Sequence, residues 1–169
     1  MTFSAKAPAS GVRVHALTPI LNVSDVPASI AWFERLGWTR GFTWNAGGLM
    51  ADATLHNAHG PATFGSVVCD VNEAGRQAPQ IFLCCGAQGA RDARTLAQIM
   101  NDPGFDPHND NVGATWMSWW VDDCDAAFAV VQRAGVDVVQ PPTTEPWGVR
   151  ECRIRHPDGH YFRISSFAK

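Results

Sequence analysis

Apolar and polar residues follow one another in a pattern that occurs twice along the chain. The segment from Val23 to Trp38 aligns without a gap with the segment from Val121 to Val136, so the two copies are offset by 98 residues. In each copy an Asp precedes apolar residues at helical spacing, and a Gly follows them. These are the residues expected at the start, the buried face and the end of a short helix. The repeat therefore predicts two similar amphipathic helices in a duplicated unit.

Both predicted helices carry start and stop signals. Asp25 and Asp123 are candidate N-caps, because an Asp side chain can accept hydrogen bonds from the first helical turn. Pro27 suits that first turn, and Gly37 and Gly135 stand where a left-handed residue ends a helix. The apolar faces are expected to contain Ile30 and Phe33 in the first copy and Phe128 and Val131 in the second.

Strand-like runs precede and follow each helix. They cover residues 16–23, 39–44, 63–71 and 80–85 in the first copy, and residues 114–121, 136–139, 149–155 and 161–167 in the second. The last two runs alternate in polarity and flank His156-Pro-Asp-Gly159, which is a strong turn signal. Each copy therefore has the order β-α-β-β-β, and the fold class is α+β with two tandem modules.

The expected organisation is one domain of two modules. Residues 1–14 are small and polar and are expected to form a loose tail. The first module is assigned to residues 15–86 and the second to residues 114–169. Residues 87–113 are rich in Gly, Asp, Asn and Pro and are expected to link the modules.

Composition excludes several classes of function. The chain has 169 residues and a net charge of −3, without a basic run that would bind nucleic acid. No apolar stretch reaches the roughly 18 residues needed to cross a membrane, and the N-terminus lacks the apolar segment of a secretory signal. The odd number of scattered cysteines favours reduced thiols over a disulfide framework. We therefore expect a cytoplasmic protein that binds neither nucleic acid nor membrane.

The order of these motifs resembles the vicinal oxygen chelate superfamily, which contains glyoxalases, bleomycin-resistance proteins and dioxygenases. The matching motifs are Leu21–Asp25, Ser29–Phe33, Leu36–Gly37, Pro146–Glu151 and His156–Ile164, within residues 15–167. The Pro-Trp-Gly and Pro-Asp-Gly sequences are most similar to the bleomycin-resistance branch. The resemblance implies curved mixed sheets around a cavity, and it implies a homodimer.

Metal-dependent members of the superfamily hold their metal with His, Glu or Gln residues on the first and last strands of each half. By position, the corresponding residues of this chain are Thr18, Phe82, Trp116 and Arg163. Phenyl and indole rings have no lone pair for a divalent metal, and an arginine repels a cation. We therefore expect no metal or other cofactor at these positions. A metal site built from other residues is the alternative.

Strand alternation extends the set of side chains that would face inward with these four. The expected ligand-binding residues are Thr18, Phe82, Trp116, Ser118, Trp120, Trp147, Glu151, Arg153, Tyr161 and Arg163. Aromatic walls with few polar groups are typical of a small-molecule site. Met117, Trp119, Val121, Cys152, Ile154, Phe162 and Ile164 are expected to face the helices instead.

Two of these assignments have alternatives. Trp116 and Trp120 could pack the sheet instead of a ligand. Arg163 could form a salt bridge with Glu151 across the hairpin, or it could bind a carboxylate or phosphate of the ligand. The six histidines fall in loops and turns, which favours solvent-exposed side chains for all of them.

Catalytic signals are weak. No Ser-His-Asp order, glycine-rich phosphate loop or HExxH sequence is present. Glu151 is the only carboxylate that we nominate as a general base, and nearby arginines would keep it ionised. The leading hypothesis is a metal-independent protein that sequesters a planar aromatic or antibiotic-like compound and so gives antibiotic resistance. The alternatives are a superfamily enzyme (lyase, isomerase or dioxygenase-like) and a purely structural module.

Overall fold

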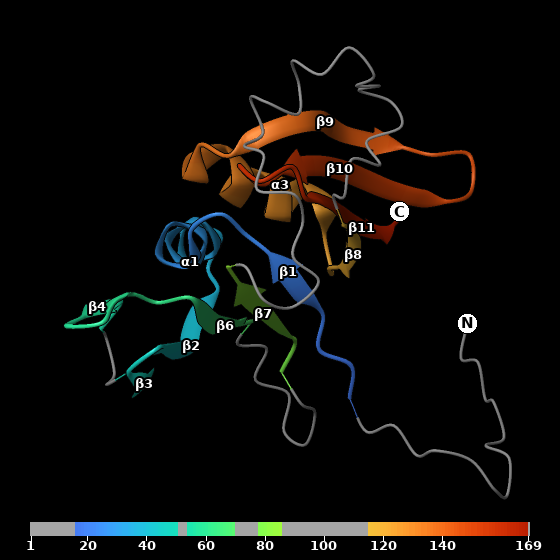
Figure 1. Cartoon of the computed structure of the whole chain (residues 1–169). Helices are drawn as coiled ribbons and strands as arrows, with labels where there is room; N and C mark the ends of the chain where they lie inside the picture. Colours follow the sequence, from blue (N-terminus) through green and yellow to red (C-terminus); the bar gives the residue numbers. More distant parts are fainter. Residues whose placement is uncertain (1–15, 51–53, 70–77, 86–114, 169) are drawn as a thin grey trace, which may run out of the picture.

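The chain forms two mixed β-sheets, with helix α1 between them and helix α3 against the second sheet (Figure 1). The computed structural model describes residues 16–50, 54–69, 78–85 and 115–168. The expected tail and linker, residues 1–14 and 87–113, lie outside these described residues. None of the described helices is long and apolar enough to cross a membrane.

The first sheet has the strand order β1-β7-β6-β2-β3. Its strands are β1 (Ile20–Asn22), β2 (Thr39–Asn45), β3 (Gly48–Leu49), β6 (Phe64–Val68) and β7 (Gln80–Cys84). Strand β1 is parallel to β7, and the other neighbours are antiparallel. A small separate sheet pairs β4 (His56–Asn57) with β5 (Gly60–Pro61).

The second sheet repeats this topology with the order β8-β11-β10-β9. Its strands are β8 (Trp116–Trp120), β9 (Asp137–Thr144), β10 (Val149–Arg155) and β11 (Tyr161–Phe167). In each sheet the first strand is parallel to the last, and the register is preserved, since Ile20 pairs with Phe82 and Ser118 with Arg163. The 98-residue offset therefore holds in three dimensions, and the predicted α+β fold of two β-α-β-β-β modules is confirmed.

Helices α1 (Val26–Arg35) and α3 (Cys124–Ala134) begin and end at the predicted signals. Asp25 accepts a hydrogen bond from the backbone N–H of Ala28, and Asp123 caps α3 in the same way. Gly135 ends α3 with a left-handed φ of 62°, which is strained for any residue with a side chain.

The strand boundaries differ from the predictions where prolines occur. The first strand was expected from residue 16 but begins at Ile20, after Pro19, which has no N–H for the sheet. Strand β9 was expected to end at Val139 but continues to Thr144. It tolerates Pro141 and Pro142 because it is an edge strand and its pairing with β10 shifts register there.

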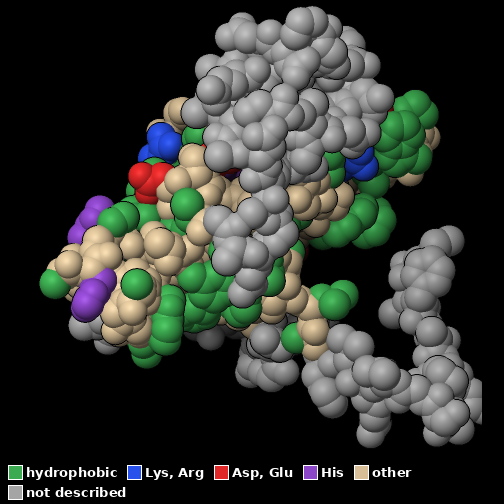
Figure 2. All heavy atoms as spheres, in the orientation of Figure 1, with side chains coloured by type: hydrophobic (Ala, Val, Ile, Leu, Met, Phe, Trp, Pro, Cys, Tyr) green, Lys and Arg blue, Asp and Glu red, His purple; other side chains and the backbone are tan. Residues whose placement is uncertain are grey.

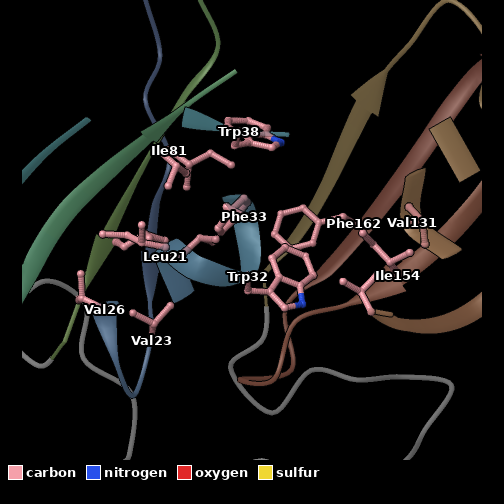
Figure 3. Close-up of a cluster of buried hydrophobic side chains, with 14 of the residues drawn as sticks. Leu21, Val23, Val26, Trp32, Phe33, Trp38, Ile81, Val131, Ile154 and Phe162 are labelled. Atoms are coloured by element: carbon pink, nitrogen blue, oxygen red, sulfur yellow. The ribbon is translucent and has the colours of Figure 1, made fainter. Parts of the chain in front are cut away.

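A single hydrophobic core joins the two modules. Trp32 and Phe33 of α1 lie 5.5 Å and 5.7 Å (ring centroids) from Phe162 of β11. Figure 3 shows these rings meeting between the first sheet, which contributes Leu21 and Ile81, and the second. Helix α1 is thus buried on both sides, which explains its pair of adjacent aromatic residues. The predicted core positions of Phe33, Cys152 and Ile154 are confirmed.

The turn between β10 and β11 also connects the modules. The His160 ring accepts a hydrogen bond from Thr115 N at Nδ1, so its Nε2 carries the proton and donates to the Asn22 carbonyl 2.7 Å away. Asp158 accepts a hydrogen bond from the Ser24 backbone N–H. The turn therefore binds the end of β1 and the start of α1.

The prediction that every histidine is solvent-exposed is wrong for His156 and His160, which are buried. A turn sequence predicts a surface position only when nothing packs against the turn, and here the first module covers it. His56 and His59 are exposed as expected. His15 and His108 lie outside the described residues.

Candidate functional site

The second sheet has one face that is not covered by α1 or α3. Side chains of β8 alternate along the strand: Trp116, Ser118 and Trp120 are exposed, whereas Met117 and Trp119 are partly buried against the core. The pairing of β8, β11 and β10 places further side chains on the same side of the sheet, of which Glu151, Tyr161 and Ser165 are buried. We call it the open face; its residues are Trp116, Ser118, Trp120, Glu151, Arg153, Arg155, Tyr161, Arg163, Ser165 and Phe167.

Aromatic side chains stand at both ends of β8 on the open face. The Trp116 indole stacks on the Tyr161 ring, with 4.7 Å between centroids and 10° between planes. The Trp120 indole lies 5.4 Å from the Phe167 ring. Trp116 is 40% exposed and Trp120 61% exposed. Ser118, with its small side chain, lies between the two indoles and pairs with Arg163.

A charged cluster lies beside these aromatic rings. Glu151 is 1% exposed, and its Oε1 accepts a hydrogen bond of 3.0 Å from Arg153 Nη2. Arg163 Nε lies 3.5 Å from the same oxygen, without a hydrogen bond. Both guanidinium carbons lie 5.9 Å from the Trp116 ring centroid, within the range of a cation–π interaction. The salt-bridge interpretation of Arg163 is therefore confirmed, but it leaves the N–H donors of that arginine unused among the described residues.

Two predicted site residues belong to the first module and do not contact this cluster. Phe82 lies on the side of the first sheet opposite α1, where its ring is within 5.5 Å of the Phe42 and Phe64 rings (centroids). Thr18 is half-buried and precedes β1. Among the described residues, no ring contact, hydrogen bond or ion pair joins Phe82 or Thr18 to the open face.

Trp147, the last predicted site residue, is exposed in the turn between β9 and β10. Figure 2 shows hydrophobic side chains at the outer end of this hairpin and over the first sheet around β2 and β6.

Sequence reasoning missed several aromatic and charged neighbours of the predicted site residues. Phe42 and Phe64 surround Phe82, and Phe167 lies beside Trp120. Arg155 donates to Asp137 and to the Tyr161 hydroxyl at the edge of the open face. Strand alternation was the signal for Arg155 and Phe167, because they lie two and four residues from positions that were named.

The buried thiols do not offer a nucleophile. Cys124 of α3 and Cys152 of β10 lie together beneath the helix, on the side of the sheet opposite the open face. Burial raises the pKa of Cys152 to about 12, and Cys124 raises it further. Since only the thiolate reacts as a nucleophile, this cysteine stays inert at neutral pH. All five cysteines are free thiols.

The family model of the Glyoxalase/Bleomycin resistance protein/Dioxygenase superfamily matches residues 13–164. This chain belongs to that superfamily. The match covers both modules, in agreement with the duplicated topology. A comparison with curated protein sequences finds no match.

Several solved structures share the fold at low sequence identity. A glyoxalase-related enzyme from Clostridium phytofermentans is 21% identical, with a TM-score of 0.59 over 93% of this chain and 98% of that chain. TioX from Micromonospora sp. ML1 is 16% identical, with a TM-score of 0.55 over 90% of this chain and 99% of that chain. A bleomycin-binding protein complexed with bleomycin is 16% identical, with a TM-score of 0.54 over 90% of this chain and 98% of that chain. These likenesses show the fold alone.

The residues at the four superfamily metal positions do not fit a divalent cation. Phe82 and Trp116 offer no donor atom, and the Arg163 guanidinium is itself a cation. Their neighbours do not replace the missing ligands, because the described residues contain no group of three His, Cys, Asp or Glu side chains that could hold a metal. The charged side chains of the open face, three arginines and one carboxylate, suit an organic ligand better than a metal ion.

Proposed function

We propose that this protein binds and sequesters a planar aromatic small molecule on the open face of its second sheet, as a metal-independent member of the bleomycin-resistance type. The observation that carries the proposal is the exposure of two indoles, Trp116 and Trp120, on one side of a strand whose other side already packs in the core. Large exposed apolar side chains that share a face mark an interaction site more often than a folding requirement.

The chemistry of the open face supports a ligand that stacks. Indole rings bind flat aromatic molecules through area and ring geometry. Ser118, the residue between the two indoles on this side of β8, has a small and exposed side chain. The arginines beside Trp116 do not favour a cationic ligand, since like charges repel.

The enzyme alternative depends on Glu151, and its surroundings do not favour it. A general base must reach the proton that it removes. The Glu151 carboxylate is buried and its Oε1 is bound by Arg153. If the protein is nevertheless an enzyme, Glu151→Gln should abolish turnover while ligand binding persists. We further propose a cytoplasmic homodimer, on the basis of the resemblance to dimeric relatives.

Binding is tested by titrating planar aromatic compounds, including quinoline and naphthalene derivatives and bleomycin, while Trp fluorescence is followed in the presence of EDTA. We expect saturable binding that weakens at least tenfold in Trp116→Ala and in Trp120→Ala. Each lost stacking contact is worth about 0.5–1.5 kcal/mol beyond the apolar area that it buries, the lost area adds to this, and 1.4 kcal/mol corresponds to a factor of ten.

Trp44→Ala provides the matched control, because Trp44 is an exposed indole of the first sheet. It should leave the affinity unchanged. Equal weakening by all three variants, or saturable binding only after addition of a divalent metal, would contradict the proposal.

A further inference from the structure

Arg163 differs from the neighbouring Arg155 in its hydrogen bonding. Arg155 donates to Asp137 and to the Tyr161 hydroxyl. The Arg163 guanidinium makes no hydrogen bond to a described residue, although it carries five N–H donors. Its Nε is buried, but the side chain as a whole is 37% exposed, so the donors of the two Nη atoms can reach a molecule on the open face.

The charges of the cluster do not cancel. Arg153 and Arg163 are paired directly opposite each other on β10 and β11, an arrangement that is unfavourable for like charges. Glu151 supplies one negative charge between them. Glu145, in the adjacent turn, accepts a hydrogen bond from Gln140 and forms no ion pair with either arginine. Both arginines therefore share one carboxylate, and among the described residues this cluster of three side chains has a net positive charge.

This positive charge lies beside Trp116, one of the two exposed indoles. Trp116 and Trp120 are four residues apart on β8, which separates their Cα atoms by about 13 Å. Ser118 lies midway between them and pairs with Arg163 on β11. A flat ring that rests over Ser118 would therefore have an indole at each end and the Arg163 guanidinium at its side.

From this arrangement we infer that the ligand is a planar aromatic acid, whose carboxylate is bound by Arg163 while its ring lies between Trp116 and Trp120. A guanidinium binds a planar carboxylate through two parallel hydrogen bonds, which suits a single negative charge. Arg153 adds positive charge nearby, but its Nη2 already donates a hydrogen bond to Glu151. This inference rests on the proposed function and adds the charge of the ligand to it.

The experiment compares pairs of probes that differ only in charge: naphthalene-2-carboxylate with its amide, and quinoline-2-carboxylate with its amide. Affinities are measured by isothermal titration calorimetry at low salt and at 0.5 M NaCl. We expect each acid to bind at least tenfold more tightly than its amide. High salt should reduce the preference, because salt screens exposed charges. In Arg163→Gln the acid and the amide should bind about equally.

Arg133→Gln is the matched control, since it removes the same charge from an exposed position on α3. It should keep the full preference for the acids, and the thermal unfolding of both variants should show that they fold. Equal binding of acid and amide to the wild-type protein would overturn the inference and leave the proposed function standing. Failure of all four probes to bind would overturn both. A preference for the acids that Arg163→Gln retains would also contradict the role of Arg163.

Discussion

His156 packs against the Trp32 ring at the junction of the modules, with 4.9 Å between ring centroids. Burial lowers the pKa of His156 to about 4 from its ordinary value of 6.5; Asp158 opposes the shift and His160 adds to it. The Asp158 backbone N–H donates to His156 Nδ1. The histidine is therefore neutral in the folded protein above pH 5, and protonation would place a charge inside an aromatic cluster.

The free energy of unfolding should fall as the pH is lowered from about 6.5 to 4. In that window the unfolded chain takes up a proton at His156 and the folded protein does not, so stability is lost with decreasing pH. The loss from this group is up to about 3 kcal/mol. Urea denaturation at several pH values measures this loss. In His156→Gln the free energy of unfolding should depend less steeply on pH in this window. An unchanged slope in the variant would show that other groups cause the pH dependence.

For single residues of the site, the sequence predicted the side of the sheet on which a side chain lies wherever strand alternation determines that side. The exposed side of Trp116, Ser118 and Trp120 follows from a period of two residues along β8. The contact of Glu151 with Arg163 follows from the hairpin that His156–Gly159 specifies. Burial of His160 was not predictable, because its partner Asn22 is 138 residues away.

Elements with strong local signals were the ones that the sequence predicted correctly. Strands β10 and β11 have the predicted bounds, since their alternation and the Pro-Asp-Gly turn agree. Strands β3, β4 and β5 were missed, because each has two residues and shows no period. The extension of β9 was missed because prolines usually end a strand, and only its edge position in the sheet permits them.

Helix α3 should depend on its N-cap. Asp123 accepts hydrogen bonds from the backbone N–H groups of Asp125 and Ala126. Asp123→Ala leaves these donors unpaired and should lower the free energy of unfolding by about 0.5–2 kcal/mol. Asp123→Asn keeps an acceptor and should cost much less. Urea denaturation of both variants checks this, and an equal loss in the two would show that the charge matters more than the cap.

At the scale of the whole molecule, the two modules share one core through α1. The inter-module contacts come from side chains such as Trp32 and Phe33, and no hydrogen-bonded strand pair joins the two sheets among the described residues. The sequence predicted each module but not this arrangement, because periodicity describes a local face and not the partner of that face. For the same reason, the separation of Phe82 from the Arg163 cluster was not predictable.

Removal of the Trp32 side chain should destabilise both modules together. Trp32→Ala leaves a cavity between Phe33 and Phe162 and should cost about 3–5 kcal/mol. Trp44→Ala removes an exposed indole and should cost about 1 kcal/mol or less. Circular dichroism and Trp fluorescence should report one coincident unfolding transition in the wild-type protein. Two separate transitions would show that the modules unfold independently.

The central claim is that an aromatic ligand stacks on the open face without a metal. The most direct measurement is a titration of ¹⁵N-labelled protein with naphthalene-2-carboxylate in EDTA, in which the indole N–H signals of the seven tryptophans are followed by NMR. We predict saturable shifts of the Trp116 and Trp120 signals and little change for the core residues Trp32 and Trp38. Unmoved Trp116 and Trp120 signals, or shifts that require an added divalent metal, would contradict the account.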